Sequence, residues 1–300
     1  MSRTVRVFQV DAFTNQKFAG NPAGVVLDAD ALADSEMLAI ARELHNADTA
    51  FVLEPDGTDH DLRLRFFTPR SEAGFVGHAT IAAHFVRARL GADGRRVRQK
   101  QSAGMVDVEI RGSDTGRRVA IRRDAPAAGR ELASRERLAV LDALALSSGD
   151  LDSQCPLQIY GTASSRLLVG VRGPRQLKQL KPDHQRLTTL SAQLGTAGFF
   201  VFSREQTDQQ LALQSRMFCP AIGIPEDPVS GNAHSLLGAY LLQHRLLTAD
   251  GDHAAFAGQQ GQFVGRPGRV EIELQLAAGQ LRDVWIIGEA ALVFETTITL

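Results

Sequence analysis

The sequence contains little cysteine, no excess of charge and no long apolar run. Its two cysteines, Cys155 and Cys219, lie outside any CxxC or Cys/His spacing, which fits a reducing compartment and predicts no structural zinc. Its 33 Lys and Arg residues balance 34 Asp and Glu residues, so neither nucleic acid nor an anionic membrane is an expected partner. No apolar stretch reaches the roughly 18 residues of a membrane-spanning helix, and MSRTVRVFQVDAF at the N-terminus is interpreted as a first strand and not as a signal peptide. These absences predict a soluble, cytoplasmic, globular protein.

The sequence also lacks the fingerprints of several chemistries. It has no Gly-rich phosphate loop, no dinucleotide-binding fingerprint, no Ser-His-Asp signature and no HExxH motif. No cofactor and no metal are therefore predicted. Proton transfer is the chemistry left for isolated carboxylates and histidines.

Strand and helix patterns recur along the 300 residues, a length that predicts two domains. Period-2 alternation predicts half-buried, antiparallel strands at VRVFQV, DLRLRFF, VDVEI and RVEIEL, and again at Phe294, Ile298 and Leu300. Helices are clearest at about residues 34–45, 78–90 and 232–246. The last two are apolar on almost every side, so protein must enclose them. Each half is therefore expected to wrap a sheet or barrel around one central helix.

One motif occurs twice. RFFTPRSEAGFVGHATIAAHFV and RMFCPAIGIPEDPVSGNAHSLLGAY share R-x-F-x-P, then a Glu, then a Gly five residues later, with a three-residue insertion after the proline of the second copy. The copies begin at Arg65 and Arg216, with the pairs Glu72–Gly77 and Glu226–Gly231. This predicts an ancestral duplication.

The expected domain boundary lies within or beside an arginine-rich stretch, residues 111–137. We expect an N-terminal domain at 1–125 and a C-terminal domain at 126–300, with the last strand as a candidate to return to the first domain. The arginines are interpreted either as a basic binding arm or as a solvated strand and linker, and the strand-like VAI favours the second interpretation.

The start of each enclosed helix is a candidate binding site. A buried helix leaves its first N–H groups without intrahelical partners and carries partial positive charge there. Small residues let a ligand approach that backbone, so a carboxylate or phosphate could bind. The alternative is structural: Asn232 caps its helix and Gly77 makes a tight turn. The candidate binding residues are Gly77, Ala79, Ser230, Gly231, Asn232 and Ala233.

Asp48 is a candidate general base. It stands in HNADTAFVL, between an amphipathic helix and an apolar strand. A carboxylate at this position either holds a chain reversal or acts as a base in a partly desolvated cleft. Residue type alone favours the chain reversal.

Together these segments resemble the PhzF family of phenazine-biosynthesis-like isomerases along nearly the whole chain. The resemblance rests on VFQVDAFTNQKFAGNPAGVVL, HNADTAFVL, FFTPRSEAGFVGHATIAA, EDPVSGNAHSLLGAYL, and GRPGRV with IIGEA. It implies the diaminopimelate-epimerase-like α+β fold, with two pseudo-symmetric domains, each a mostly antiparallel β-barrel around a central helix, and a cleft between them. It also implies a homodimer and cofactor-independent proton transfer on a small carboxylic acid. Asp48 matches the family's shuttling acid/base, while His78 and Asp227 match residues that orient the substrate or assist transfer.

The sequence departs from the family pattern at three places. Asp48 stands where the family has Glu, and its reach is shorter by about 1.5 Å. Asn232 stands where the family usually has Ser. The two-thiol epimerases of this superfamily need a Cys at the positions of Val76 and Ser230, and neither residue supplies a thiolate, so two-base stereoinversion is disfavoured.

The leading hypothesis is an isomerase that shifts a proton within an activated carboxylic acid, with Asp48 as base and then acid. One alternative is a protein that binds small carboxylates in the same cleft without efficient catalysis. Another is a racemase, epimerase or lyase that uses the same cleft. The sequence leaves these alternatives open.

Overall fold

Two compact units make up the chain. The structure, a computed structural model, describes residues 3–92, 94–112, 116–162, 164–206 and 211–300. One unit comprises Met1–Arg123 with Ile287–Leu300, and the other comprises Asp124–Ile286. The division falls after Arg123, where the sequence placed it after residue 125, and the last segment of the chain belongs to the first unit.

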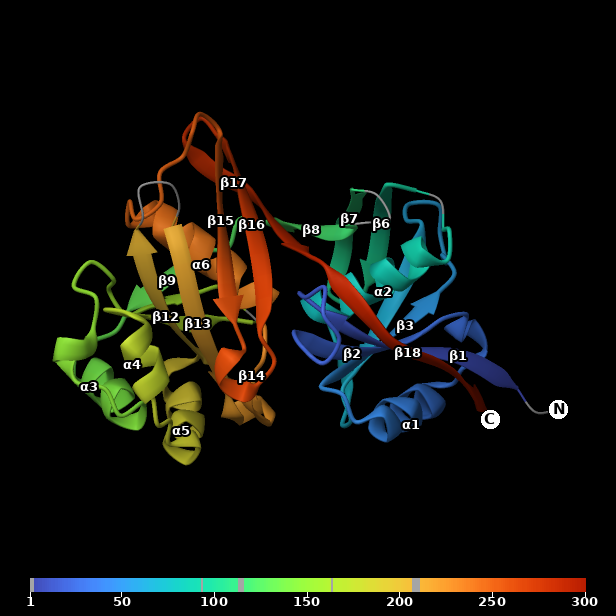
Figure 1. Ribbon diagram of the computed structural model, residues 1–300, viewed down its shortest axis with the longest axis horizontal. Coiled ribbons are helices and arrows are strands. Elements are labelled where there is room, and N and C mark those ends of the chain that lie inside the picture. Colours follow the sequence, from blue (N-terminus) through green and yellow to red (C-terminus); the bar gives the residue numbers. More distant parts are fainter. Residues whose placement is uncertain (1–2, 93, 113–115, 163, 207–210) are drawn as a thin grey trace. The chain divides into compact units, whose positions relative to one another are not determined.

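The first unit combines a mixed sheet with helices α1 and α2 (Figure 1). Its elements are β1 (Thr4–Ala12), β2 (Asn21–Val26), α1 (Asp34–Leu44), β3 (Asp48–Leu53), β4 (Leu62–Phe67), β5 (Glu72–Ala73), α2 (Gly77–Arg89), β6 (Arg96–Gln101), β7 (Gly104–Arg111), β8 (Arg118–Asp124) and β18 (Ala290–Thr299). The stretch 111–137 contains β8, so its strand interpretation is confirmed there. Residues 113–115 of that stretch lie outside the described residues.

The second unit adds more helices to a similar sheet. Its elements are β9 (Ala128–Glu131), α3 (Ser134–Ala143), β10 (Gln158–Tyr160), β11 (Arg166–Val171), α4 (Pro174–Gln179), α5 (His184–Leu194), β12 (Phe199–Gln206), β13 (Leu211–Cys219), β14 (Ile224–Asp227), α6 (Gly231–Gln243), β15 (His253–Gln260), β16 (Gly268–Ala277) and β17 (Gln280–Gly288). Figure 1 shows α3, α4 and α5 grouped beside β12 and β13.

Both units pair their strands in the same order. In the first, the series β18-β1-β2-β3-β4-β6-β7 is antiparallel except at β2–β3 and β4–β6, which are parallel. In the second, the series β9-β10-β11-β12-β13-β15-β16 is antiparallel except at β11–β12 and β13–β15. The short strands β5 and β14 form antiparallel hairpins on β4 and β13, and the buried helix follows each of them.

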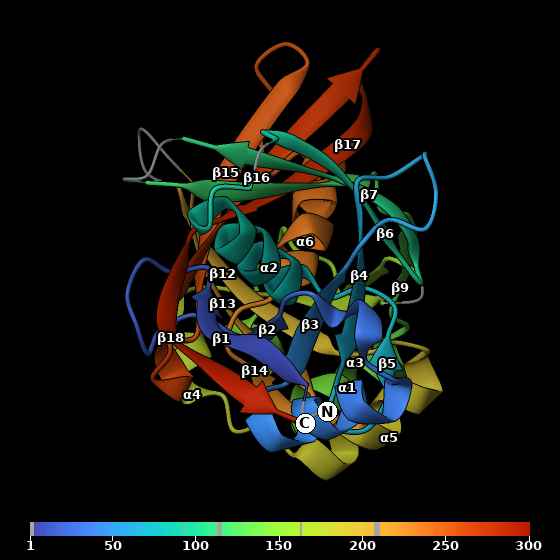
Figure 2. The ribbon, with the colours of Figure 1, turned by 90° about the vertical axis from the view of Figure 1, so that its right-hand side faces the viewer.

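In the first unit the sheet lies between α1 and α2. Ala50 and Leu64 belong to the core that contains α2, whereas Phe51 and Leu53 belong to the core that contains α1. Figure 2 shows α2 and α1 on opposite sides of β1, β2 and β3. Because successive residues of a strand face opposite ways, Asp48, two residues before Ala50, lies on the α2 face.

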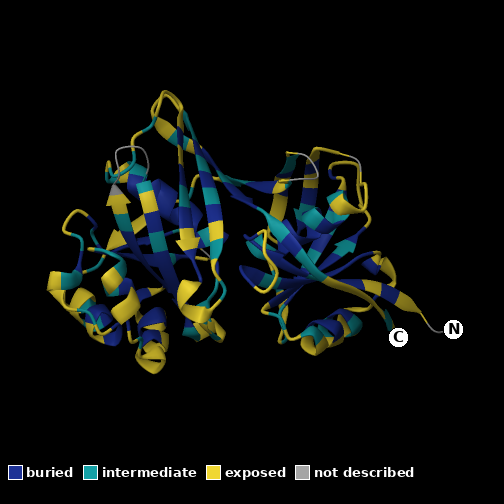
Figure 3. Ribbon diagram, viewed as in Figure 1, coloured by how far each residue is buried: buried dark blue, intermediate teal, exposed yellow. Residues whose placement is uncertain are grey.

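The second unit has the same layering. Leu167, Val169 and Phe199 face the core formed with α3, α4 and α5. On the other face, Phe200 packs edge-on against His234 of α6, with ring centroids 5.1 Å apart. Helix α6 is buried along most of its length, whereas α3 and α5 alternate buried and exposed residues (Figure 3). Enclosure on all sides explains why the sequence of α6 is apolar throughout.

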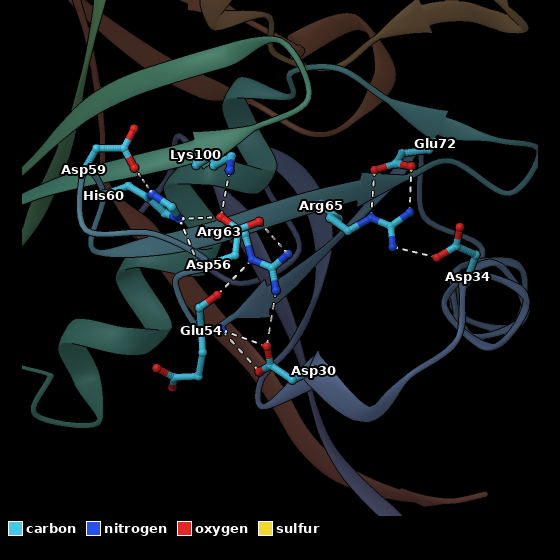
Figure 4. A network of polar contacts seen from close by, with 10 residues as sticks. All are labelled: Asp30, Asp34, Glu54, Asp56, Asp59, His60, Arg63, Arg65, Glu72 and Lys100. Carbon is cyan, nitrogen blue, oxygen red and sulfur yellow. Dashed lines mark hydrogen bonds and ion pairs between the residues drawn. The ribbon is translucent and has the colours of Figure 1, made fainter.

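The repeated arginine and glutamate form an ion pair in each unit. Nε and Nη2 of Arg65 donate to the two carboxylate oxygens of Glu72 at 2.9 and 2.8 Å (Figure 4). Arg216 donates to both oxygens of Glu226 in the same way, at 2.9 and 2.7 Å. Each guanidinium also stacks on the phenylalanine two residues later, 5.1 Å from the ring centroid in both units. The repeat is therefore a structural motif of strand, hairpin and helix start.

The three predicted helices are confirmed as α1, α2 and α6, whereas α3, α4 and α5 were not predicted. The expectation of a half-buried last strand is confirmed at Ile298, which packs against the core that contains α1. It is wrong at Phe294 and Leu300, which are 47% and 39% exposed. Among the described residues, no helix combines the length and the apolar character that a membrane crossing requires.

Gly258 of β15 is expected to be intolerant of a side chain. A Cβ at this position would lie 2.4 Å from two ring atoms of His234, which is fully buried and cannot move aside. We expect Gly258→Ala to lower the free energy of unfolding by about 1–3 kcal/mol, measured by urea denaturation. At Gly149 an added Cβ meets only Ser147 Oγ at 3.6 Å, so Gly149→Ala should cost no more than about 0.5 kcal/mol. Equal losses in the two variants would contradict the clash.

Buried histidines are expected to make the fold sensitive to acid. Burial lowers the pKa of His78, His84 and His234 to about 4, whereas an unfolded histidine titrates near 6.5. Between these values the unfolded chain binds more protons than the folded protein, so the free energy of unfolding falls as the pH falls from about 6.5 to about 4.

Replacing one of these histidines should reduce the fall in the free energy of unfolding at acid pH. His84 is held in α2 by Gln99 Oε1, 2.9 Å from its Nε2. We expect His84→Gln to make the dependence of unfolding free energy on pH shallower by up to about 1.4 kcal/mol per pH unit, measured by urea denaturation between pH 4.5 and 7. His253→Gln, which replaces an exposed histidine, is the control. An unchanged slope in His84→Gln would count against the burial argument.

Candidate active site

The structure brings Asp48 and His78 together in the first unit. Asp48 is the first residue of β3, and His78 is the second residue of α2. Nε2 of His78 lies 3.7 Å from Oδ2 of Asp48, and the two side chains are 10% and 11% exposed. The sequence placed these residues 30 positions apart, and they meet because β3 presents alternate residues to α2.

The imidazole of His78 is neutral and incompletely bonded. Burial lowers its pKa to about 4, so it carries no charge at pH 7. Its Nε2 is buried and has no hydrogen-bond partner among the described residues, because 3.7 Å to Asp48 is too long for a hydrogen bond. A buried ring nitrogen without a partner is costly and is typical of a group that bonds to a ligand.

The start of α2 offers backbone N–H groups. No side chain caps this helix, and its first hydrogen bond runs from the Thr80 N–H to the Val76 carbonyl at 3.0 Å. The N–H groups before Thr80 have no intrahelical acceptor, and they lie where the helix is partially positive. Gly77 has no left-handed backbone conformation, and a Cβ there would approach only the Phe75 ring at 3.9 Å. Gly77 is the first residue of α2, and its backbone does not need glycine for a left-handed conformation.

The start of α6 is built differently. Ser230 is its N-cap, with Oγ accepting from the Ala233 N–H at 3.3 Å. Asn232 instead donates from Nδ2 to the Ser164 carbonyl at 3.1 Å. The alternative interpretation of Asn232 as the helix cap is therefore wrong. Gly231 is buried at the first helical position, and the Ala233 N–H is already engaged by the cap.

The fourth residues of α2 and α6, Thr80 and His234, have the same role. Oγ1 of Thr80 donates to the Val76 carbonyl at 2.8 Å. Nδ1 of His234 lies 2.8 Å from the Ser230 carbonyl. Both side chains close the first turn onto the residue before the helix, so His234 is a structural residue.

Asp227 lies in the second unit, at the end of β14. It is partly buried, and its backbone carbonyl accepts from Gln260 Nε2 at 2.6 Å. Gln260 Oε1 also accepts from the Ser230 N–H at 3.1 Å, so one glutamine ties β14 to the start of α6. The participation of Asp227 and the α6 start in one site with Asp48 stays a prediction.

Other candidate groups lie outside this arrangement. Cys155 and Cys219 are buried and unpaired, and burial raises the pKa of both thiols, to about 11 and about 12. Cys219 is 2% exposed and is a small buried residue between Phe218 and Pro220. Within the described ranges, no three His, Cys, Asp or Glu side chains are grouped to hold a metal ion. A cavity of about 450 Å³ in the second unit is lined by Leu138, Leu141, Asp142 and their neighbours, and it contains none of the candidate residues.

A protein family model matches most of the chain. The model of the PhzC-PhzF family, described as phenazine biosynthesis-like proteins, matches residues 10–296. The chain belongs to this family. It is 37% identical over its full length to an uncharacterized isomerase of Clostridium acetobutylicum, which it also covers fully. A trans-2,3-dihydro-3-hydroxyanthranilate isomerase of Pseudomonas chlororaphis is 31% identical over 97% of this chain and 98% of that protein.

A solved structure of the family supports the fold. The PhzF family protein of Bacillus anthracis superposes with a TM-score of 0.88 at 28% identity, covering 99% of this chain and all of that one. The prediction of an α+β fold of this family is confirmed. The two pseudo-symmetric barrels stay a prediction. The prediction that the protein is an isomerase is also confirmed by its relatives.

In this phenazine biosynthesis-like isomerase, His78 should titrate far below an ordinary histidine. We expect its imidazole to remain neutral down to about pH 5, with a midpoint near 4, because burial disfavours the charged form. The measurement is ¹⁵N NMR of histidine side chains during a pH titration, with the resonance assigned by its loss in His78→Gln. A His78 midpoint near the 6.5 of an unfolded histidine would contradict its burial.

Proposed function

We propose that the protein moves a proton from one carbon to another within a small carboxylic acid, without a cofactor. Asp48 is the base that removes the proton and then the acid that returns it. One observation carries the proposal: the carboxylate of Asp48 lies in a nearly buried position, 3.7 Å from a neutral, unbonded imidazole nitrogen. Membership of an isomerase family supports the same chemistry.

The proposed reaction needs no oxidant and no second reactant. Asp48 takes a proton from a carbon next to an unsaturated system, and the electron pair of the broken C–H bond delocalises into that system. Asp48 then gives the proton to a different carbon, so one C–H bond breaks, another forms and the double bond moves. Neutral His78 cannot repel a cationic substrate group, and it can hydrogen-bond to the substrate or to Asp48 as charge moves.

The acid group of the substrate is proposed to bind at the helix starts. The uncapped start of α2, at Gly77 and Ala79, supports this because N–H groups at a partially positive helix end favour a carboxylate. Ser230, Gly231 and Asn232 are proposed to complete the binding of polar substrate groups, with Asp227 as an orienting residue. Since the Ala233 N–H already donates to Ser230, Ala233 is proposed to give close approach and not a hydrogen bond.

The proposed substrate class is a small, unsaturated carboxylic acid. The relative from Pseudomonas chlororaphis is named for its action on trans-2,3-dihydro-3-hydroxyanthranilate, which belongs to this class. Asp48 is shorter by one methylene than the Glu of the family motif, which changes its reach by about 1.5 Å. A change of about 1 Å can alter a rate about a hundredfold, so we propose a substrate that sits closer to β3 than in that relative.

We further propose that the two units are duplicated copies, each with its sheet curled into a barrel around its buried helix. The matching order and direction of seven strands in each unit support the duplication. The enclosure of α2 and α6 supports the curvature, because a helix buried on most sides needs strands on more than one side.

Replacement of Asp48 by Asn should abolish proton transfer. Asn keeps the size of Asp but cannot accept a proton, and a general acid–base group contributes about 10²–10⁴-fold to a rate. The measurement is ¹H NMR of unsaturated carboxylic acids in D2O, dihydroanthranilates included, following both deuterium uptake and the isomerised product. We expect Asp48→Asn to lower both by at least about a hundredfold.

Asp28 supplies a matched control. It is exposed and has φ of 54°, a conformation that Asn tolerates well. Asp28→Asn should retain the wild-type rate. Isomerisation that persists in Asp48→Asn would remove the assigned base. Acids that bind and raise the melting temperature, but never exchange or isomerise, would instead indicate a binding protein.

A further inference from the structure

The Arg65–Glu72 ion pair lies where three elements of the first unit meet. Arg65 is on β4, Glu72 is on β5, and a third contact joins Arg65 Nη1 to Asp34 at the first turn of α1, at 2.7 Å (Figure 4). The two-point contact with Glu72 fixes both the distance and the orientation of the partners. The hydrogen bond to Glu72, and next the hydrogen bond to Asp34, raise the pKa of Arg65 above its usual range. The arginine therefore stays charged.

The pair connects the segments that carry Asp48 and His78. Arg65 lies directly opposite Phe51 in the β3–β4 ladder. Phe51 follows Asp48 by three residues on β3. Glu72 starts β5, and His78 follows six residues later. Strand β5 has only two residues, so its ladder with β4 holds it weakly. The side-chain fork is one constraint on the path from β4 to the start of α2, beside the Thr68–Ser71 turn and the hydrogen bond from the Ala103 N–H to the Gly74 carbonyl.

The second unit repeats the arrangement in different surroundings. Arg216 and Glu226 form the same fork before α6. The third contact of Arg216 is different, because its Nη1 donates to the Leu177 carbonyl at 3.0 Å and not to an acidic side chain. What both copies share is the link from the long strand to the hairpin before the helix. A role at the helix start explains this shared part better than general surface stability does.

We propose that Arg65 and Glu72 are positioning residues for catalysis: they hold the β5–α2 connection so that His78 and the N–H groups of α2 stay in place beside Asp48. This proposal rests on the proposed function of Asp48. The side chains of Arg65 and Glu72 are 25% and 34% exposed, and a two-point arginine–carboxylate pair contributes to stability as well as to geometry. A matched two-point pair elsewhere in the chain is therefore needed to separate the two effects.

The test uses Glu72→Gln and a matched control. Gln removes the charge and one arm of the fork while keeping the size of the side chain. The control is Glu136→Gln, because Arg130 on β9 and Glu136 in the first turn of α3 also form a two-point pair, at 2.6 and 2.7 Å, with side chains 49% and 30% exposed. Arg65→Lys is a second variant, since Lys keeps the charge but loses the fork.

Two readouts are measured: kcat and KM for the Asp48-dependent exchange, and the titration of His78 by ¹⁵N NMR. We expect Glu72→Gln and Arg65→Lys to lower kcat about tenfold or more, with the His78 midpoint rising from about 4 toward 6.5 as water reaches the ring. Glu136→Gln should leave both at wild-type values. Melting temperatures of Glu72→Gln and Glu136→Gln should be similar.

The proposal is overturned if Glu72→Gln keeps both the wild-type kcat and the wild-type His78 titration, or if Glu136→Gln changes them equally. Absence of exchange in the wild-type protein would instead contradict the proposed function. In that case the His78 titration alone decides whether the ion pair positions the start of α2.

Discussion

Burial of one helix in each unit along most of its length is the constraint on which this structure depends. A helix on a surface can leave its first N–H groups to water, but α2 and α6 begin among packed strands. Protein or ligand must then supply the acceptors. In α6 the Ser230 hydroxyl does so, whereas α2 has no side-chain cap. The two helices have the same length, so the absence of a side-chain cap distinguishes the start of α2 from that of α6 and supports the proposal that an acid binds there.

The same layering that buries α2 also determines its acid/base partner. Alternation along β3 directs Asp48 to the α2 face and Thr49 to the α1 face, because Ala50 packs with α2 and Phe51 with α1. Removal of water from this face lowers the pKa of His78 and strengthens electrostatic interactions nearby. One feature, the sheet between two helices, thus supplies the position and the electrostatic environment of both groups.

The sequence predicted what local pattern controls, and it missed what long-range contact controls. Uninterrupted apolar periodicity predicted α2 and α6, and the R-x-F-x-P repeat marked the hairpins before them. The contact of Asp48 with His78 depends on the register of β3 against its neighbours, which residue type does not encode. Asn232 and Ser230 are both good caps, and only the backbone path places Ser230 at the cap. Phe294 is exposed although Ile298 of the same strand is partly buried, a difference that the alternating sequence does not show.

Under the proposed duplication, the position in the second unit that corresponds to Asp48 has no room for an acid/base side chain. Phe67 pairs with Thr49, and the equivalent Phe218 pairs with Phe199, so the position of Asp48 corresponds to Gly198. A Cβ at Gly198 would lie 2.6 Å from Cys219 Sγ and 2.8 Å from the Phe218 carbonyl, which leaves no room for any side chain. The second unit therefore cannot gain a carboxylate there by a single substitution. A single carboxylate that removes and returns the proton favours transfer along one face of the substrate, which is the requirement of an isomerase and not of an enzyme that inverts a carbon with two opposed bases.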